Sequence, residues 1–391
     1  MKALKITGII IGILILFGIG FGGFATYKLR KALNPSINTK DLESRIDDTF
    51  NKLIDKGEHT GVALAYYKND TVLIKTYGSK DKESGEAVDT NTIFEIGSIS
   101  KVFTTSLLQM TADAGLVKLE DDFRQYLPDS IEYGFDYPIS LEQLATHTSG
   151  FPKLPLRWFD DSLVVNECNP YTHLNFDTIV AYLENPSELS KPGNVEYSNL
   201  GNGLIGHVLE RVHNKSLNEL LDSMIFTPLN MTHSAIETDS SLKHLLATGY
   251  DTEGKATCNW QIPILGGAGA IESNIPDMLQ FLKANLNEDN PLYTSFSKCH
   301  KVINSGFTGN QCLGWMNGAD AISELLFKNA GDFVFHNGAT GGFCSVIILD
   351  KAENSGLIVL SSGGKSDGII GADPTDEGIT IMNLARSVSL N

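Results

Sequence analysis

Basic side chains are scarce in this sequence, which has 30 Lys and Arg against 47 Asp and Glu and a formal net charge of −17. Residues 1–31 hold five of the basic side chains and no acidic one, so removing those five charges from −17 leaves −22 on the rest of the chain. Proteins bind nucleic-acid phosphates mainly through cationic side chains. The charge therefore argues against a nucleic-acid partner, and it favours solubility without bearing on any reaction.

Cysteine is also scarce, and its spacing shows no disulfide framework. An odd number leaves at least one thiol unpaired within the chain, and we interpret the cysteines as small buried apolar residues, with their pairing left open. Cys299-His300 and Cys312 lack a second ligand pair at metal-binding spacing, so no metal site is predicted. No cysteine precedes Cys168, which excludes a lipid-modified N-terminal cysteine. The five are Cys168, Cys258, Cys299, Cys312 and Cys344.

One long uncharged run lies near the N-terminus, from Ile6 to Tyr27, and reads ITGIIIGILILFGIGFGGFATY. About 20 apolar residues span a bilayer as a helix, whereas the apolar region of a cleaved signal peptide has only ~7–15. The length favours a membrane anchor within residues 1–31, and the small residues Gly23 and Ala25 keep signal cleavage open. Either way we expect the body to be extracytoplasmic, periplasmic for instance, and either membrane-anchored or secreted.

Strand-like patterns occur at both ends of the chain and helical patterns in the middle. GVALAYY and TVLIKTYG, within residues 61–78, predict a hairpin, and DFVFHNG, FCSVIILD and SGLIVLSS predict three more strands. We therefore predict an α/β (α+β) fold, with one antiparallel sheet built from both termini, flanked by helices. Residues 32–97 and 325–391 would form the sheet domain, and residues 98–324 an inserted α-helical domain.

The first candidate for chemistry is FEIGSISKVF, where Ser98 precedes Lys101 by three residues. Ser-x-x-Lys occurs five times in the chain, so its spacing alone proves little. Only Ser98 lies where a β-region gives way to a helical pattern, and a helix start favours developing negative charge. Lys101 would share its face, either stabilising the alkoxide or, when neutral, accepting the proton. The alternative is a capping serine and a surface lysine.

Two further motifs follow in order. PGNVEYSNLGNGLIG places Tyr197 and Asn199 on a loop before a helix, where nearby cations would lower the tyrosine pKa and make it a general base. FVFHNGATGGF places His336 and Gly338 on a strand, followed by a backbone N–H at Ala339 that could join an oxyanion hole. The plainer interpretations are a structural loop and a tight hairpin turn with an exposed histidine.

Together these motifs resemble those of the serine β-lactamase and penicillin-binding superfamily, in its class C β-lactamase-like branch with esterases and D-aminopeptidases. Other segments resemble the family in the same order over roughly residues 40–390, namely LATHTSGFP, FTPLNM, ATGYD, GGAGAIES and LGW. The resemblance implies the fold predicted above, with the active site between the two domains. It implies that Ser98 is the acylated nucleophile, Lys101 its activator and Tyr197 the general base, with no metal or other cofactor.

The resemblance also implies substrate-binding and oxyanion roles. Asn199 matches the last residue of the loop motif, His336 and Gly338 match the ends of the strand triad, and Ala339 matches the oxyanion donor after it. In β-lactamases this triad usually begins with lysine, and His336 replaces that fixed cation with a group largely neutral at pH 7. His147 and Glu95 lie in family-like segments, where we expect them to be structural.

We therefore expect a serine acyl-hydrolase for a small-molecule or peptide substrate with an ester, amide or lactam bond. His336 weakens the case for efficient β-lactam hydrolysis. A D-Ala-D-Ala peptidase or penicillin-binding protein, acyl transfer to a non-water acceptor, and a non-catalytic sensor on the same fold stay open. The sequence does not give the oligomeric state.

Overall fold

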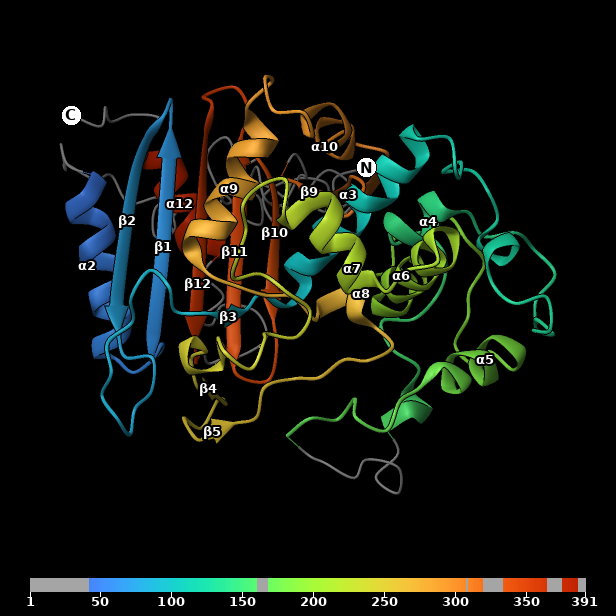
Figure 1. Cartoon of the computed structure of the whole chain (residues 1–391), viewed down its shortest axis with the longest axis horizontal. Coiled ribbons are helices and arrows are strands. Elements are labelled where there is room, and N and C mark those ends of the chain that lie inside the picture. The colour runs from blue at the N-terminus through green and yellow to red at the C-terminus, as the bar shows by residue number, and fades with distance from the viewer. Residues whose placement is uncertain (1–41, 160–167, 307–308, 319–332, 364–374, 386–391) are drawn as a thin grey trace, which may run out of the picture.

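The computed structural model describes most of the chain after the N-terminal region (Figure 1). The apolar run Ile6 to Tyr27 lies outside the described residues, and within them no helix has the length and apolar character needed to cross a membrane. The described residues are 42–159, 168–306, 309–318, 333–363 and 375–385.

An antiparallel sheet forms the centre of the fold, as expected. Over the described residues it has eight strands in the order β2-β1-β12-β11-β10-β9-β8-β7. The N-terminal strand β1 pairs with the C-terminal strand β12 along its whole length, from Gly61 opposite Ser362 to Lys68 opposite Ser355. Its strands are β1 (Gly61–Lys68), β2 (Thr71–Gly78), β7 (Asn304–Gly306), β8 (Gly309–Gln311), β9 (Met316–Asn317), β10 (Val334–Ala339), β11 (Phe343–Asp350) and β12 (Ser355–Ser362).

The β1–β2 hairpin turns through Asn69 and Asp70, whose φ angles are +46° and +67°. Two consecutive left-handed residues are the signature of a type I′ turn, whose twist matches that of the flanking strands. Asparagine and aspartate tolerate this conformation better than other side chains do. The turn fixes the register, in which Lys68 lies opposite Thr71.

Strand β1 is buried on both faces, because helices cover both sides of the sheet. Val62 and Leu64 belong to the core under α2 (Leu42–Asp55) and α12 (Thr375–Ala385), whereas Ala63 and Ala65 belong to the core on the opposite face. In Figure 1 α2 flanks the sheet beyond β2, and α9 (Ile275–Leu286) crosses the other face. The alternation follows from the two-residue period of a strand.

The sheet extends further back along the chain than we expected. Strands β7 to β9 precede residue 325, at which we placed the second part of the sheet domain. They are two or three residues long, and Asn304, Ser305 and Gly306 give no hydrophobic alternation that would predict a strand. The division of the chain into two domains stays a prediction.

The region between β2 and β7 consists mostly of helices and long loops, as predicted. Its α-helices, besides α9, are α3 (Ser100–Asp113), α4 (Leu141–Ala145), α5 (Phe176–Glu184), α6 (Asn199–His213), α7 (Leu217–Leu221), α8 (Gly266–Gly269) and α10 (Tyr293–Cys299). Short strand pairs join β3 (Phe94–Glu95) to β6 (Glu272–Ser273) and β4 (Gly249–Tyr250) to β5 (Ala256–Thr257). Tighter or wider helical turns are η1 (Gly97–Ile99), η2 (Phe123–Tyr126), η3 (Leu156–Phe159), η4 (Asp222–Phe226) and η5 (Lys243–Leu245).

The cysteines differ in part from our interpretation. Cys299, Cys312 and Cys344 are buried, as small apolar residues would be. Cys168 and Cys258 instead form a disulfide across 90 residues of sequence. Cys168 is exposed, so this pair does not behave as buried hydrophobes.

Candidate active site

Ser98 lies on the turn η1, between strand β3 and helix α3. Ile99 is the N-cap of α3 and its side chain makes no capping hydrogen bond, so the helix does not use Ser98 as a conventional cap. The Ser98 hydroxyl instead meets the Lys101 amine, at 3.0 Å from Nζ to Oγ. The capping-serine alternative is therefore wrong, and the hydroxyl is available for chemistry.

Lys101 is completely buried, with an exposed fraction of 0%. Its Nζ also donates to the carbonyl oxygen of Ala268 at 2.6 Å. Burial, aided by the positive charge of Lys153, holds the pKa of Lys101 well below the ordinary 10.5. The surface-lysine alternative is wrong, and the low pKa favours a neutral amine that can take the proton of Ser98.

Tyr197 is placed by the start of helix α6. The next residue, Ser198, caps α6, with its Oγ accepting from the Gly201 N–H at 2.9 Å. The Tyr197 ring centroid lies 4.9 Å from Lys101 Nζ. Burial raises the pKa of Tyr197 to about 12, and a hydrogen bond with Ser98 opposes this rise. We expected cations to lower this pKa; the direction is opposite because burial of Tyr197 penalises its charged form.

Asn199 begins helix α6, and its backbone N–H donates to the carbonyl oxygen of Lys153 at 3.0 Å. Its side-chain oxygen Oδ1 has no hydrogen-bond partner among the described residues. Asn199 lines the same small cavity as Ser98. A buried acceptor without a partner is costly, so this oxygen is suited to accept a hydrogen bond from a bound substrate.

The end of strand β10 lies directly against the Ser98 turn. A Cβ on Gly338 would come within 2.1 Å of the carbonyl oxygen of Ile96, so only glycine allows this approach. The same carbonyl accepts a hydrogen bond from Ser345 Oγ at 2.9 Å, which ties β11 to the turn.

The N–H of Ala339 faces the nucleophile. The Thr340 N–H donates to Phe343 across the β10–β11 turn at 3.0 Å. Hydrogen bonds alternate along an antiparallel pair, so the Ala339 N–H points away from β11. Its nitrogen lies 2.7 Å from where a Cβ on Gly97 would be, beside Ser98. Ala339 lines the same cavity as Ser98. The backbone N–H groups of Ser98 and Ala339 are the two donors that a substrate carbonyl oxygen there would meet.

The chain is similar to known proteins over most of its length. The family model for beta-lactamase matches residues 46–377. The chain belongs to the beta-lactamase family. A beta-lactamase of Pseudomonas fluorescens is 28% identical over 82% of this chain and 94% of that protein. Protein flp of Staphylococcus aureus (strain N315) is 26% identical over 83% of this chain, which spans only 64% of flp.

Solved structures of the beta-lactamase family share the fold. A class C beta-lactamase superposes with a TM-score of 0.76 and 22% identity, covering 91% of this chain and 99% of that one. A beta-lactamase/D-alanine carboxypeptidase from Pseudomonas syringae gives 0.73 and 21%, covering 88% and 99%. At these identities the likeness establishes the fold alone, the mixed α/β architecture seen in Figure 1.

His336 lies on strand β10, and its side chain is buried. The exposed fraction of the residue is 1%, so the exposed-histidine alternative is wrong. Burial, with the nearby Lys101, lowers the pKa of His336 to about 3. Its Nδ1 lies 2.5 Å from the carbonyl oxygen of Asn337, which places the ring proton on Nδ1 in the neutral form. The imidazole is thus neutral at any physiological pH.

His147 supports the tyrosine loop. It adopts a left-handed backbone with φ of +59°, unusual for a side chain of this size. Its Nδ1 accepts the Ser198 N–H at 3.1 Å, and its ring lies 4.4 Å from the Tyr197 ring. His147 therefore acts as a positioning residue, in keeping with the structural role we expected.

Residues that the sequence did not point to complete the cavity. Tyr171 and Trp260 line it together with Ser98. Glu95 Oε1 accepts the backbone N–H of Trp260 at 2.7 Å, and burial raises the pKa of this carboxyl group to about 7. Both aromatic residues lie in irregular segments, where hydrophobic periodicity gives no signal.

Proposed function

We propose that this protein is a serine hydrolase that works through an acyl-enzyme on Ser98. The observation that carries the proposal is the buried Lys101 amine, 3.0 Å from Ser98 Oγ. Burial lowers the pKa of Lys101 well below 10.5, which favours the neutral amine that can act as a base. The cavity that holds Ser98 also presents Asn199 and Ala339 to a substrate.

The reaction begins when neutral Lys101 takes the proton of Ser98 and Oγ attacks the substrate carbonyl carbon. The carbonyl oxygen gains negative charge, which the N–H groups of Ser98 and Ala339 stabilise. Tyr197, protonated because its pKa is raised to about 12, donates its hydroxyl proton to the leaving group. Tyr197 then recovers a proton from Lys101. Water attacks the acyl-enzyme by the reverse route and frees Ser98.

The substrate class follows from the neutral His336. A group whose pKa is lowered to about 3 supplies no fixed positive charge for a substrate carboxylate. We therefore propose that neutral esters and amides react faster than β-lactams, whose carboxylates a lysine at this position would bind. Asn199 Oδ1 would accept a hydrogen bond from an N–H or O–H of the substrate next to the reacting bond.

Intact-protein mass spectrometry after exposure to a panel of acyl donors tests this proposal. The panel contains p-nitrophenyl esters, a penicillin and a peptide ending in D-Ala-D-Ala. We expect one acyl adduct, rapid ester turnover, and no adduct on the Ser98→Ala variant. A long-lived penicillin adduct or release of D-Ala would favour a cell-wall peptidase, and an adduct that survives Ser98→Ala would refute the proposal.

We also propose an extracytoplasmic location, anchored in the membrane or secreted. The disulfide between Cys168 and Cys258 supports it, because disulfides persist mainly in oxidising compartments. The apolar run at residues 6–27 supports it as well. Protease treatment of intact spheroplasts should degrade the protein while cytoplasmic proteins survive, and complete protection would contradict the proposal.

A further inference from the structure

Two cavities of very different size meet at Trp260. The cavity beside Ser98 has a volume of about 30 Å³, and a neighbouring cavity has about 670 Å³. Trp260 and Ile262 line both of them. Sites for drug-sized ligands usually have ~300–1,000 Å³. The space enclosed next to the nucleophile is therefore small, and the larger cavity borders the same tryptophan.

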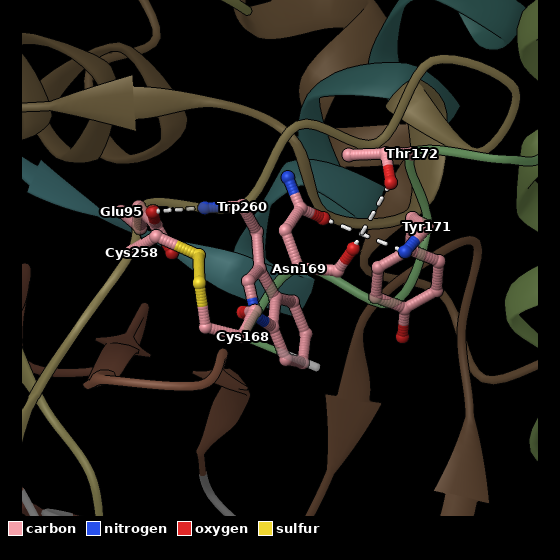
Figure 2. The surroundings of a disulfide bond; sticks show 7 residues. All are labelled: Glu95, Cys168, Asn169, Tyr171, Thr172, Cys258 and Trp260. Carbon is pink, nitrogen blue, oxygen red and sulfur yellow. Dashed lines mark hydrogen bonds between the residues drawn. A yellow bond between two sulfur atoms is a disulfide. The ribbon is translucent and has the colours of Figure 1, made fainter. Parts of the chain in front are cut away.

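The disulfide holds Trp260 in place. Cys258, two residues before Trp260, is bonded to Cys168, and the indole Nε1–H donates to the carbonyl oxygen of Cys168 at 3.1 Å. Figure 2 shows the indole beside the sulfur atoms, with Tyr171 on its other side. The Tyr171 and Trp260 rings are 5.0 Å apart between centroids at an angle of 65°, an edge-to-face contact.

Other contacts fix the same two segments. The Trp260 backbone N–H donates to Glu95 Oε1 at 2.7 Å (Figure 2). A Cβ on Gly341 would lie 2.7 Å from the indole nitrogen, so the turn after β10 also packs on this ring. The Asn169 carboxamide, oriented to satisfy both backbone groups of Gln261, accepts at 2.8 Å and donates at 3.2 Å. The disulfide and these hydrogen bonds thus hold the segments 168–172 and 258–261 together.

We propose that the Cys168–Cys258 disulfide fixes Trp260 as a partition that limits the length of the acyl group transferred to Ser98. The proposal rests on the acyl-hydrolase function proposed above and adds its substrate range, which is short acyl groups in the oxidised protein. Behind the partition, the larger cavity presents Ile262, Pro263 and Ile264. An alkyl chain that passed the indole would be buried against these apolar side chains.

The disulfide is open to reduction because Cys168 is exposed. A dithiol reductant gives up two electrons and two protons, closing to a cyclic disulfide while Cys168 and Cys258 become thiols. The covalent link next to Trp260 is then lost, although the contacts to Glu95 and Gly341 remain. Reduction should therefore make Trp260 more mobile and leave Ser98, Lys101 and Tyr197 in place.

The test compares kcat/KM for p-nitrophenyl acetate and p-nitrophenyl octanoate. We expect Trp260→Ala to raise the octanoate/acetate ratio by about tenfold or more, the effect of about two newly buried methylene groups. Cys168→Ser/Cys258→Ser should raise it in the same direction by a smaller factor. Dithiothreitol should reproduce that change in the wild type and leave the double variant unaffected. Trp260→Phe keeps an aromatic ring but loses the Nε1–H bond to Cys168, so its ratio should lie between those of the wild type and Trp260→Ala. Cys299→Ala removes an unrelated buried thiol and should keep the wild-type ratio.

The outcomes separate this proposal from the function on which it rests. Ser98-dependent turnover with an unchanged ratio in Trp260→Ala, in the double variant and in reduced wild type overturns the partition alone. Turnover of neither ester, with no adduct on Ser98, overturns the proposed function and the partition with it. Circular dichroism identifies a variant that fails to fold. In that case the octanoate/acetate ratio of the reduced wild type decides whether the disulfide limits acyl length.

Discussion

Replacing Gly338 with alanine should disable the reaction and leave the fold in place. A Cβ on residue 338 would lie 2.1 Å from the Ile96 carbonyl oxygen and 2.6 Å from Ser345 Oγ. Real Cβ contacts essentially never fall under 3.0 Å, so the strand and the Ser98 turn must separate by about 0.9 Å (3.0 less 2.1). Ser345 cannot simply move away, because its Oγ donates to that same carbonyl oxygen at 2.9 Å.

The separation displaces the Ala339 N–H relative to Ser98. Misplacing a reacting group by ~1 Å costs ~10²-fold in rate, and losing one oxyanion donor costs ~10²–10³-fold. We expect kcat for the best ester of the panel to fall about 100-fold, or ~2.7 kcal/mol of transition-state stabilisation. KM should change little, because these donors act on charge that develops only in the transition state. The rate of Ser98 acylation, followed by mass spectrometry, should fall in parallel.

Two other glycine-to-alanine substitutions, at Gly356 and Gly266, are the controls for Gly338→Ala. A Cβ on Gly356 of β12 would lie 2.8 Å from Leu282 Cδ1 and 2.9 Å from the Ile348 carbonyl oxygen, away from the site. Gly356→Ala should lower stability and keep kcat. A Cβ on Gly266 would meet its nearest atom at an ordinary 3.6 Å, so Gly266→Ala should change neither. A Gly338→Ala protein with kcat within about threefold of wild type would refute the placement of the oxyanion donors.

Three further predictions concern the buried amine and the disulfide. Lys101→Met should abolish acylation and yet raise the unfolding free energy by about 0.5–2 kcal/mol in urea titrations, because a desolvated amine is removed; equal or lower stability would contradict this. The Lys153 charge lowers the pKa of Lys101, so Lys153→Gln should raise that pKa and move the acidic limb of kcat/KM to higher pH. Lys153→Arg, which keeps the charge, should leave the limb in place, and equal shifts in both would exclude the electrostatic cause. Cys168→Ser/Cys258→Ser should lower the unfolding free energy by about 2–4 kcal/mol, and an unchanged urea midpoint would contradict it.

The parts of the fold that the sequence predicted are those with long apolar patterns. Strands such as Gly61–Lys68 and Ser355–Ser362 are buried on both faces. Nearly every residue in them therefore contributes to a pattern that predicts a strand. The strands of two or three residues extend the sheet beyond β10: β9 pairs with β10, β8 with β9, and Asn304–Gly306 with β8. The edges to which they add exist only in three dimensions. Local pattern cannot report a pairing of this kind.

The candidate site also has features that the sequence predicted and features that it did not. The helix-start setting and the two motifs that follow in order indicated Ser98 and Lys101, whereas their spacing recurs elsewhere in the chain. The direction of the Tyr197 pKa shift was out of reach, because it depends on burial contributed by many segments. The bond between Cys168 and Cys258 was equally hidden, since 90 residues separate the partners.

The basic groups around Ser98 constrain how the proton can move. Burial lowers the pKa of Lys101, His147 and His336, and Lys101 further lowers that of each histidine by charge repulsion. Burial therefore disfavours the charged form of each group, and a proton taken by Lys101 creates a cation in a desolvated space. The Tyr197 ring, 4.9 Å from that amine, offers some stabilisation. In the mechanism proposed above, the site holds this charge poorly, so the proton would pass through Tyr197 to the leaving group. Deprotonation of Ser98 would then be coupled to departure of that group.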